Sequence, residues 1–290
     1  MKWAFIFIFF VANLVKAQDN KELQQMADAD QQSRIAPDIN WIILNEQDSI
    51  RRVRVDEFFE KGEIRTAKDY LNAGIIFQHG NDTIASQKAV NCFGKAIELD
   101  STLNRWWCAA AVDRDLMRRG EPQIYGTQFI KNKMTNEKWK RYTIDTTKIS
   151  DKERKYYSVE TLAQQREKER LMNSKSISSL AGEKSIDEVV ELIKSEFEKG
   201  SQSEYNVTES AINSLGYVLM NDNRDKEALQ IFKLNTVLYP DQFNTYDSYG
   251  ECLLKLNHTK QGLKAYRKSL ELNPDNENAR KILGEFENTK

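Results

Sequence analysis

Apolar and polar residues along most of the chain recur with the period of an α-helix. Apolar side chains return every three or four residues, so they gather on one face of the helix that each stretch would form. Only 12 glycines and 4 prolines occur in 290 residues, which leaves few tight turns and also favours helices. Amphipathic helices are predicted over residues 21–35, 51–62, 66–80, 83–99, 102–120, 150–173 and 185–200.

One region breaks this helical pattern. Residues 120–129 read GEPQIYGTQF, and two glycines and a proline do not continue a helix. Residues 125–129 alternate with the period of a strand, as do residues 138–144, and a polar turn at 131–133 separates them. We therefore predict one small β-hairpin near residues 124–144, in an all-α fold made mostly of helical hairpins.

A second pattern repeats every 34 residues near the C-terminus. The small residues would let two helices approach closely, an aromatic would fill the groove beside them, and a proline would end the second helix. The matching positions are Leu215-Gly216, Tyr249-Gly250 and Leu283-Gly284, Ala228 and Gly262, Phe232 and Tyr266, and Pro240 and Pro274. They predict two helix pairs, at about 209–242 and 243–276, and a capping helix at 277–288.

This period and order resemble the tetratricopeptide repeat. Residues 185–290 are also similar to a repeat module of many secreted Bacteroidetes proteins, through segments such as NTYDSYGECLLKL and YRKSLELNPDNENARKIL. The resemblance implies a C-terminal α-solenoid within residues 174–290, which follows an N-terminal helical domain over 18–173. It also implies a surface that binds a protein or peptide partner. The other interpretation is that the repeats only pack on the N-terminal domain.

The first residues have the composition of a secretory signal peptide. Lys2 precedes an apolar run of about 13 residues, and small residues at Val15 and Ala17 suit signal peptidase. A bilayer needs about 20 apolar residues to be spanned. We therefore expect residues 1–17 to be removed near Ala17, and the mature protein to be periplasmic or extracellular and not membrane-spanning.

Charge and cysteine content narrow the classes of partner and chemistry. With 43 basic and 44 acidic residues the net charge is −1, which gives no electrostatic footprint for nucleic acid. Cys92, Cys108 and Cys252 form an odd set in apolar surroundings and are interpreted as buried thiols. A bridge between Cys92 and Cys108 stays an alternative.

Several familiar sites are excluded by their missing motifs. The chain has two histidines, His79 and His258, and no C-x-x-C, so the common zinc sites are excluded. It has neither of the glycine-rich phosphate-binding motifs and no G-x-S-x-G or S-x-x-K. We expect no metal and no cofactor.

The N-terminal half resembles an uncharacterised bacterial family of unknown function over residues 21–170. The resemblance implies no reaction, but it implies that four segments belong together. They are ADQQSR (29–34), IIFQHG (75–80), AAVDRDLM (110–117) and GEPQIYGTQF (120–129).

These four segments hold polar residues among apolar ones. Buried charges must pair or line a cleft, because an unpaired one costs several kcal/mol. One interpretation is a network that pins the hairpin onto the helices. The alternative is a pocket in which His79 is an acid or base oriented by Asp113. In that pocket Arg34 or Arg114 would hold an anion. The candidate residues are Asp30, Arg34, Gln78, His79, Asp113, Arg114, Gln123, Tyr125 and Gln128.

Taken together, these patterns predict an exported tetratricopeptide repeat protein that acts as a scaffold for a protein or peptide. A small-ligand-binding protein or an enzyme, with a polar pocket around His79, Asp113, Arg114 and Tyr125, is the alternative function.

Overall fold

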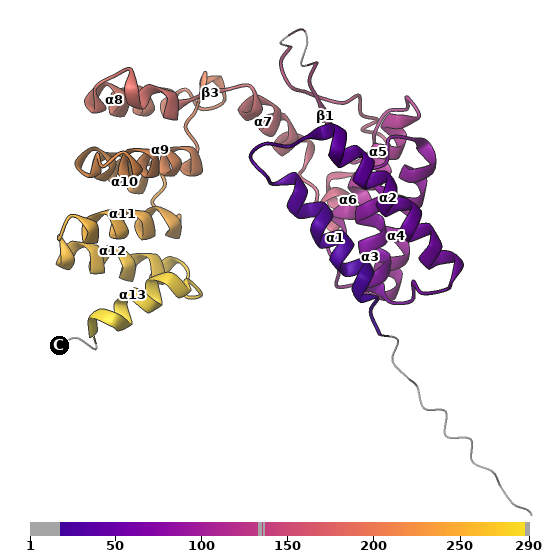
Figure 1. Ribbon diagram of the computed structural model, residues 1–290. Coiled ribbons are helices and arrows are strands. Elements are labelled where there is room, and N and C mark those ends of the chain that lie inside the picture. The colour runs from indigo at the N-terminus through magenta and orange to yellow at the C-terminus, as the bar shows by residue number, and fades with distance from the viewer. Residues whose placement is uncertain (1–17, 133–134, 136, 288–290) are drawn as a thin grey trace, which may run out of the picture. The chain divides into compact units, whose positions relative to one another are not determined.

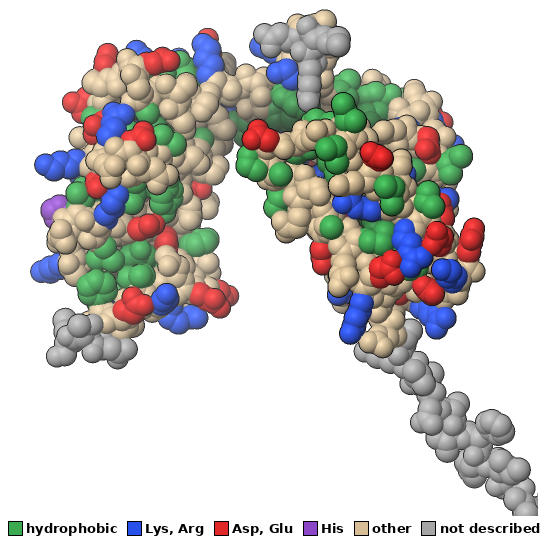
Figure 2. Space-filling model, in the orientation of Figure 1, with side chains coloured by type: hydrophobic (Ala, Val, Ile, Leu, Met, Phe, Trp, Pro, Cys, Tyr) green, Lys and Arg blue, Asp and Glu red, His purple; other side chains and the backbone are tan. Residues whose placement is uncertain are grey.

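The structure is a computed structural model that describes residues 18–132, 135 and 137–287. The predicted signal peptide lies outside the described residues. The described residues form two compact units, which divide between residues 166 and 167. No helix in the described ranges is both long and apolar enough to span a bilayer. Figure 2 shows acidic and basic side chains interspersed on the visible face of each unit.

The N-terminal unit is a set of helices packed around α3 (Figure 1). The apolar face of α3 packs against α1, α2 and α4, and α4 packs in turn on α5. Phe58, Phe77 and Phe93 fill this core and are each about 1% exposed. The helices are α1 (Lys21–Arg34), α2 (Trp41–Glu60), α3 (Ala67–Phe77), α4 (Thr83–Leu99) and α5 (Trp106–Arg118).

Helix α2 begins at Trp41, well before the predicted start at residue 51. The side chain of Asn40 caps it by accepting hydrogen bonds from the backbone N–H groups of Ile42 and Ile43. The sequence pattern missed this first half because its apolar residues do not form a buried stripe. Ile42 is 83% exposed and Ile50 is 63% exposed.

The predicted hairpin is present, but it is shorter than the alternation indicated. Strand β1 (Phe129–Ile130) pairs with the antiparallel strand β2 (Lys140–Arg141), and part of the predicted turn lies outside the described residues. Residues 125–127 do not form a strand. They wrap around a buried carboxylate instead, as described below.

The single helix predicted over 150–173 is wrong. Two helices occupy this range, α6 (Asp151–Tyr156) and α7 (Leu162–Met172). Ser158 adopts a left-handed conformation (φ 56°) between them, and the buried side chain of Val159 follows. The hydroxyl of Thr161 then accepts a hydrogen bond from the N–H of Gln164 and starts α7. The charged pattern continued through this break, because most residues on both sides are exposed.

The C-terminal unit is a stack of helices, as Figure 1 shows. Strands β3 (Lys175–Ser176) and β4 (Tyr205–Asn206) pair in parallel near its start, where the short helices η1 (Ile177–Gly182) and η2 (Gly200–Gln202) also lie. The predicted helix over 185–200 is confirmed as α8. The helices of the stack are α8 (Ile186–Glu198), α9 (Glu209–Asn221), α10 (Asp225–Leu238), α11 (Phe243–Lys255), α12 (Thr259–Leu272) and α13 (Glu277–Glu287).

Small residues of the 34-residue pattern lie where paired helices touch. A Cβ on Gly216 of α9 would stand 2.5 Å from the Phe232 ring of α10. A Cβ on Gly262 of α12 would stand 2.7 Å from Leu254 of α11. This close packing joins α9 to α10 and α11 to α12. The all-α fold class, with its small hairpin and C-terminal helix stack, is confirmed.

Candidate functional site

Asp113 on α5 organises the loop that follows this helix. Its side chain is fully buried, and both carboxylate oxygens accept hydrogen bonds from the loop. The backbone N–H groups of Ile124 and Tyr125 donate to Oδ1, both at 2.9 Å. Those of Gly126 and Thr127 donate to Oδ2 at 2.8 Å, as does the Thr127 hydroxyl. Consecutive amides thus enclose the anion, which leaves it shielded from solvent.

A second buried layer holds the same loop from the other side. Arg154 is 1% exposed, and its guanidinium donates to the carbonyls of Tyr125 and Ile124 at 3.0 Å. Gln165 donates to the Tyr125 carbonyl at 2.8 Å. The pattern did not single out Arg154 or Gln165, because both lie in charged segments that read as solvated helices. Burial raises the pKa of the Tyr125 hydroxyl, which therefore stays protonated.

The two glutamines of the loop connect it to the hairpin and to α5. Gln123 donates to the carbonyls of Gln128 and Tyr142 at 3.0 and 2.8 Å, and it accepts from the Gln128 N–H. Gln128 donates to the Ala110 carbonyl at 3.3 Å and to the Thr127 hydroxyl at 2.9 Å. The side-chain amides of both glutamines therefore form hydrogen bonds within the fold.

His79 belongs to a different cluster, between α1 and α2. Its Nδ1 lies 3.0 Å from Oδ2 of the fully buried Asp30, an ion-pair distance without an aligned hydrogen bond. Arg34 contacts Asp30 at 2.9 Å and Asp48 at 2.5 Å, and Arg51 contacts Asp48 at 3.0 Å. Burial alone would raise the pKa of Asp30, but the contacts with His79 and the charge of Arg34 lower it.

In the alternative pocket interpretation Asp113 orients His79, and the structure does not place them in contact. Both oxygens of Asp113 are taken by the loop, and the carboxylate beside the imidazole is Asp30.

Arg114 bridges the two clusters. Its Nη1 donates to the carbonyl of Gln78 at 3.2 Å, and its Nε donates to the Gln128 side chain at 3.4 Å. Arg118, one turn further along α5, donates to the same Gln78 carbonyl at 3.4 Å. The four segments at residues 29–34, 75–80, 110–117 and 120–129 are thus in contact with one another. They form one polar network, in which Asp30 and Asp113 are fully buried and Arg34 and Arg114 are partly exposed.

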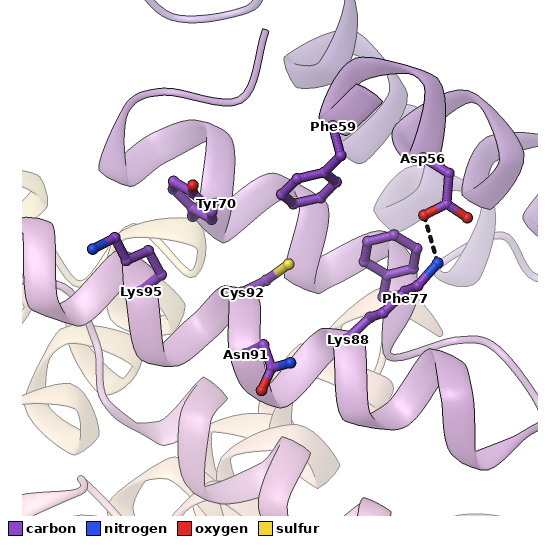
Figure 3. A pocket seen from close by; sticks show the side chains of 8 residues that line it. All are labelled: Asp56, Phe59, Tyr70, Phe77, Lys88, Asn91, Cys92 and Lys95. Atoms are coloured by element: carbon purple, nitrogen blue, oxygen red, sulfur yellow. Dashed lines mark hydrogen bonds and ion pairs between the residues drawn. The ribbon is translucent and has the colours of Figure 1, made fainter. Parts of the chain in front are cut away.

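A groove between α2, α3 and α4 was not predicted from the sequence (Figure 3). It has a volume of about 390 Å³, and the rings of Phe59 and Phe77 stack in it with centroids 6.3 Å apart. In Figure 3, Lys95 lies at one end of the residues drawn, and Lys88 pairs with Asp56 toward the other end, at 2.6 Å. Burial raises the pKa of Cys92 in its wall to about 12, so this thiol is not a ready nucleophile.

The cysteines do not pair in the structure. Cys92 and Cys252 are buried and Cys108 is half-buried, and all three are free. No group of three or more His, Cys, Asp or Glu side chains within the described ranges could hold a metal ion.

Polar side chains connect the first helices of successive repeats. The Tyr217 hydroxyl of α9 donates to Glu251 of α11 at 2.7 Å and to Ser248 at 3.2 Å. Asn244 of α11 donates to Glu209 of α9 at 3.0 Å. These contacts align α9 with α11 on one face.

The same face continues onto α13. It carries acidic side chains and one hydrogen-bond acceptor without a partner. Asp247 accepts hydrogen bonds from Asn276 and Asn278 at 2.7 and 2.9 Å, which ties α11 to the start of α13. Oδ1 of Asn213 in α9 is buried without a hydrogen-bond partner. We call the face formed by α9, α11 and α13 the first-helix face.

A second hollow in the stack, of about 480 Å³, lies between α11 and α12. Its wall combines the rings of Tyr246 and Tyr249 with the basic side chains of Lys264, Arg267 and Lys268. This hollow is mainly basic, whereas the first-helix face is acidic.

Comparison with known proteins identifies a family for one part of the chain only. No curated protein matches the chain significantly. Residues 243–276, which are α11, α12 and the turn that follows them, match the family model of the tetratricopeptide repeat.

Proposed function

We propose that the protein is an exported scaffold whose repeat stack binds an extended protein or peptide segment along the first-helix face. Tetratricopeptide repeats generally mediate protein interactions, and the repeat match supports this general role. The observation that carries the proposal is the Oδ1 of Asn213, a buried acceptor without a partner on this face. Asn213 itself is partly exposed, and an N–H group of a bound backbone would satisfy this oxygen once the side chain turns toward solvent.

The charges of the first-helix face favour a basic partner segment. Glu209, Asp247 and Glu251 place three carboxylates on adjacent helices, and each already accepts a neutral donor. Lysine or arginine side chains of a bound segment would meet these carboxylates. Such binding should weaken as salt is raised, because exposed charges are screened.

Photo-crosslinking distinguishes binding at the first-helix face from binding elsewhere on the stack. Placed at Asn213, it should form adducts with a bound partner, whereas at Lys233, which is exposed on α10, it should form none. Asp247→Asn together with Glu251→Gln should reduce the adduct several-fold. Equal adducts from both positions, or a partner still captured after removal of residues 205–290, would contradict the proposal.

Export rests on the sequence of residues 1–17 alone. The N-terminus of the protein recovered from the periplasm or the medium should be Gln18. Recovery of the protein inside the cell with residues 1–17 intact would contradict export, and it would leave the binding test unaffected.

A further inference from the structure

The turn that follows α3 is surrounded by arginines. Residues 78–80 read Gln-His-Gly, and the Gln78 carbonyl accepts from Arg114 and Arg118 of α5. Arg52 of α2 lies against the same turn, since a Cβ on Gly80 would stand 3.2 Å from its Cδ. Guanidinium groups from two helices therefore converge on the C-terminal end of a third.

These arginines have no acidic partner in contact. Within the described part of the chain, no carboxylate lies within 4.0 Å of the guanidinium of Arg52, Arg114 or Arg118. The nearby carboxylates already serve other groups. Asp30 faces Arg34 and His79, Asp115 pairs with Arg119 and accepts from Ser86, and Asp82 accepts from the Ala85 N–H. Burial lowers the pKa of Arg118, and the charges of Asp82 and Asp115 oppose this from beyond contact distance.

A carbonyl at a helix end does not neutralise two full charges. The C-terminal end of a helix carries about half of one negative charge. Burial first, and then repulsion from Arg118 and Arg34, lower the pKa of Arg114 to about 10. Because arginine keeps its proton at neutral pH, the burial and repulsion of this charge lower the stability of the fold.

Donors are also left over at this turn. The Nη1 of Arg118 is buried without any acceptor. Arg114 and Arg118 are both partly exposed, so other parts of their side chains meet solvent although Nη1 of Arg118 does not. Two planar guanidinium forks that face one point are the arrangement that binds carboxylate and phosphate oxygens.

We propose that Arg114 and Arg118, together with the turn at residues 78–80, form a binding site for a small oxyanion, a carboxylate or a phosphate group. The oxygens of the ion accept hydrogen bonds from the unused N–H groups of both guanidinium groups. The negative charge of the ion offsets the repulsion between the two arginines. This site lies in the N-terminal unit, and it is independent of the docking role proposed for the repeats.

Thermal unfolding and titration calorimetry of the full mature protein test this site. Sodium phosphate and sodium acetate are compared with sodium chloride at equal ionic strength. A higher melting temperature and a saturable heat with phosphate, with acetate or with both would support the site and identify the ion. If neither phosphate nor acetate raises the melting temperature above its value in chloride, and neither gives a saturable heat, the proposal is overturned.

Two matched variants test the residues. Arg118→Gln should weaken the binding at least tenfold, because it removes one of the two guanidinium groups that would hold the ion. Arg65→Gln is the control, since Arg65 is exposed and also donates to a carbonyl beyond a helix end, that of Gly62. Equal weakening by both variants would overturn the proposal. If Arg118→Gln does not fold, Arg114→Lys takes its place, because lysine lacks the planar fork.

Discussion

At the scale of single residues, the loop after α5 depends on glycine at one position. Gly126 has φ 96°, which lets its N–H and that of Thr127 both point at Asp113. It also leaves room for Gln165, because a Cβ at this position would stand 2.0 Å from Oε1 of Gln165. The network therefore requires both the left-handed conformation and the absence of a side chain.

Gly126→Ala should therefore destabilise the protein by about 3–5 kcal/mol. Left-handed strain contributes about 1 kcal/mol. Displacement of the buried Gln165 removes its three hydrogen bonds, to the carbonyls of Tyr125 and Glu160 and from Arg141, at about 1 kcal/mol each. Gly120→Ala is the control, because Gly120 also has a positive φ of 74° but open space around it. It should cost only about 1 kcal/mol. Urea unfolding measures both, and equal losses would contradict the role given to Gln165.

Residue types alone identified part of this network. Asp113, Gln123 and Gln128 stand among apolar residues, and such groups must find partners when buried. Their partners could not be named from the sequence. Arg154 and Gln165 reach the loop from 29 and 40 positions away in the chain, a distance that depends on how the helices pack.

At the scale of helices, the repeated glycines have unequal roles although the sequence pattern treats them alike. Gly216 lies against Phe232, whereas Gly284 in α13 has no atom within 4 Å of the position of a Cβ. Gly216→Ala should cost about 1–3 kcal/mol through overpacking. Gly284→Ala should stabilise by up to about 1 kcal/mol, because alanine favours a helix. Opposite shifts in the melting temperature are expected, and a loss from both variants would contradict this difference.

The end of α8 is fixed by a carboxylate that gives a test of acid stability. Glu196 is 3% exposed and contacts Lys199 and Ser203, and its ion pair with Lys199 is the main cause that lowers its pKa from 4.5 to about 2. Because the folded pKa lies below the unfolded one, this carboxylate stabilises the fold above about pH 4.5 and loses that effect as the pH falls toward 2.

Glu196→Gln should therefore be destabilised at pH 7 and should approach the wild type near pH 2. The difference in unfolding free energy between the two proteins, measured from pH 7 to 2, checks the sign. Glu198→Gln, at an exposed position of the same helix, should follow the wild type throughout. A constant gap between Glu196→Gln and the wild type would contradict the low pKa.

Helix positions could be predicted from the sequence where one face of the helix is buried. The prediction failed where no face is buried. The stripes of α4 and α9 to α12 face a core, so their periodicity is strong. The start of α2 is exposed, and the break between α6 and α7 depends on Ser158, whose left-handed conformation is set by packing. Periodicity records burial, so elements outside the core leave a weak pattern.

At the scale of the whole molecule, the two units have separate cores. The main core of the N-terminal unit is built from α1 to α5. That of the C-terminal unit is built from η1 and α8 to α11, and a further cluster lies between α12 and α13. The boundary between the units falls within α7, at residues 166 and 167. Since each unit buries its own apolar residues, each should unfold as a cooperative unit.

Calorimetry of the mature protein should therefore resolve two transitions that respond to different variants. Gly126→Ala should lower only the transition of the N-terminal unit, because its contacts lie with α5, α6 and α7 of that unit. Gly216→Ala should lower only the other, because Phe232 belongs to the repeat core. A single transition that both variants shift would mean that the two cores unfold as one. Phosphate or acetate should raise only the transition that Gly126→Ala lowers, because Arg114 and Arg118 belong to the N-terminal unit, so the same measurement assigns the anion site to its unit.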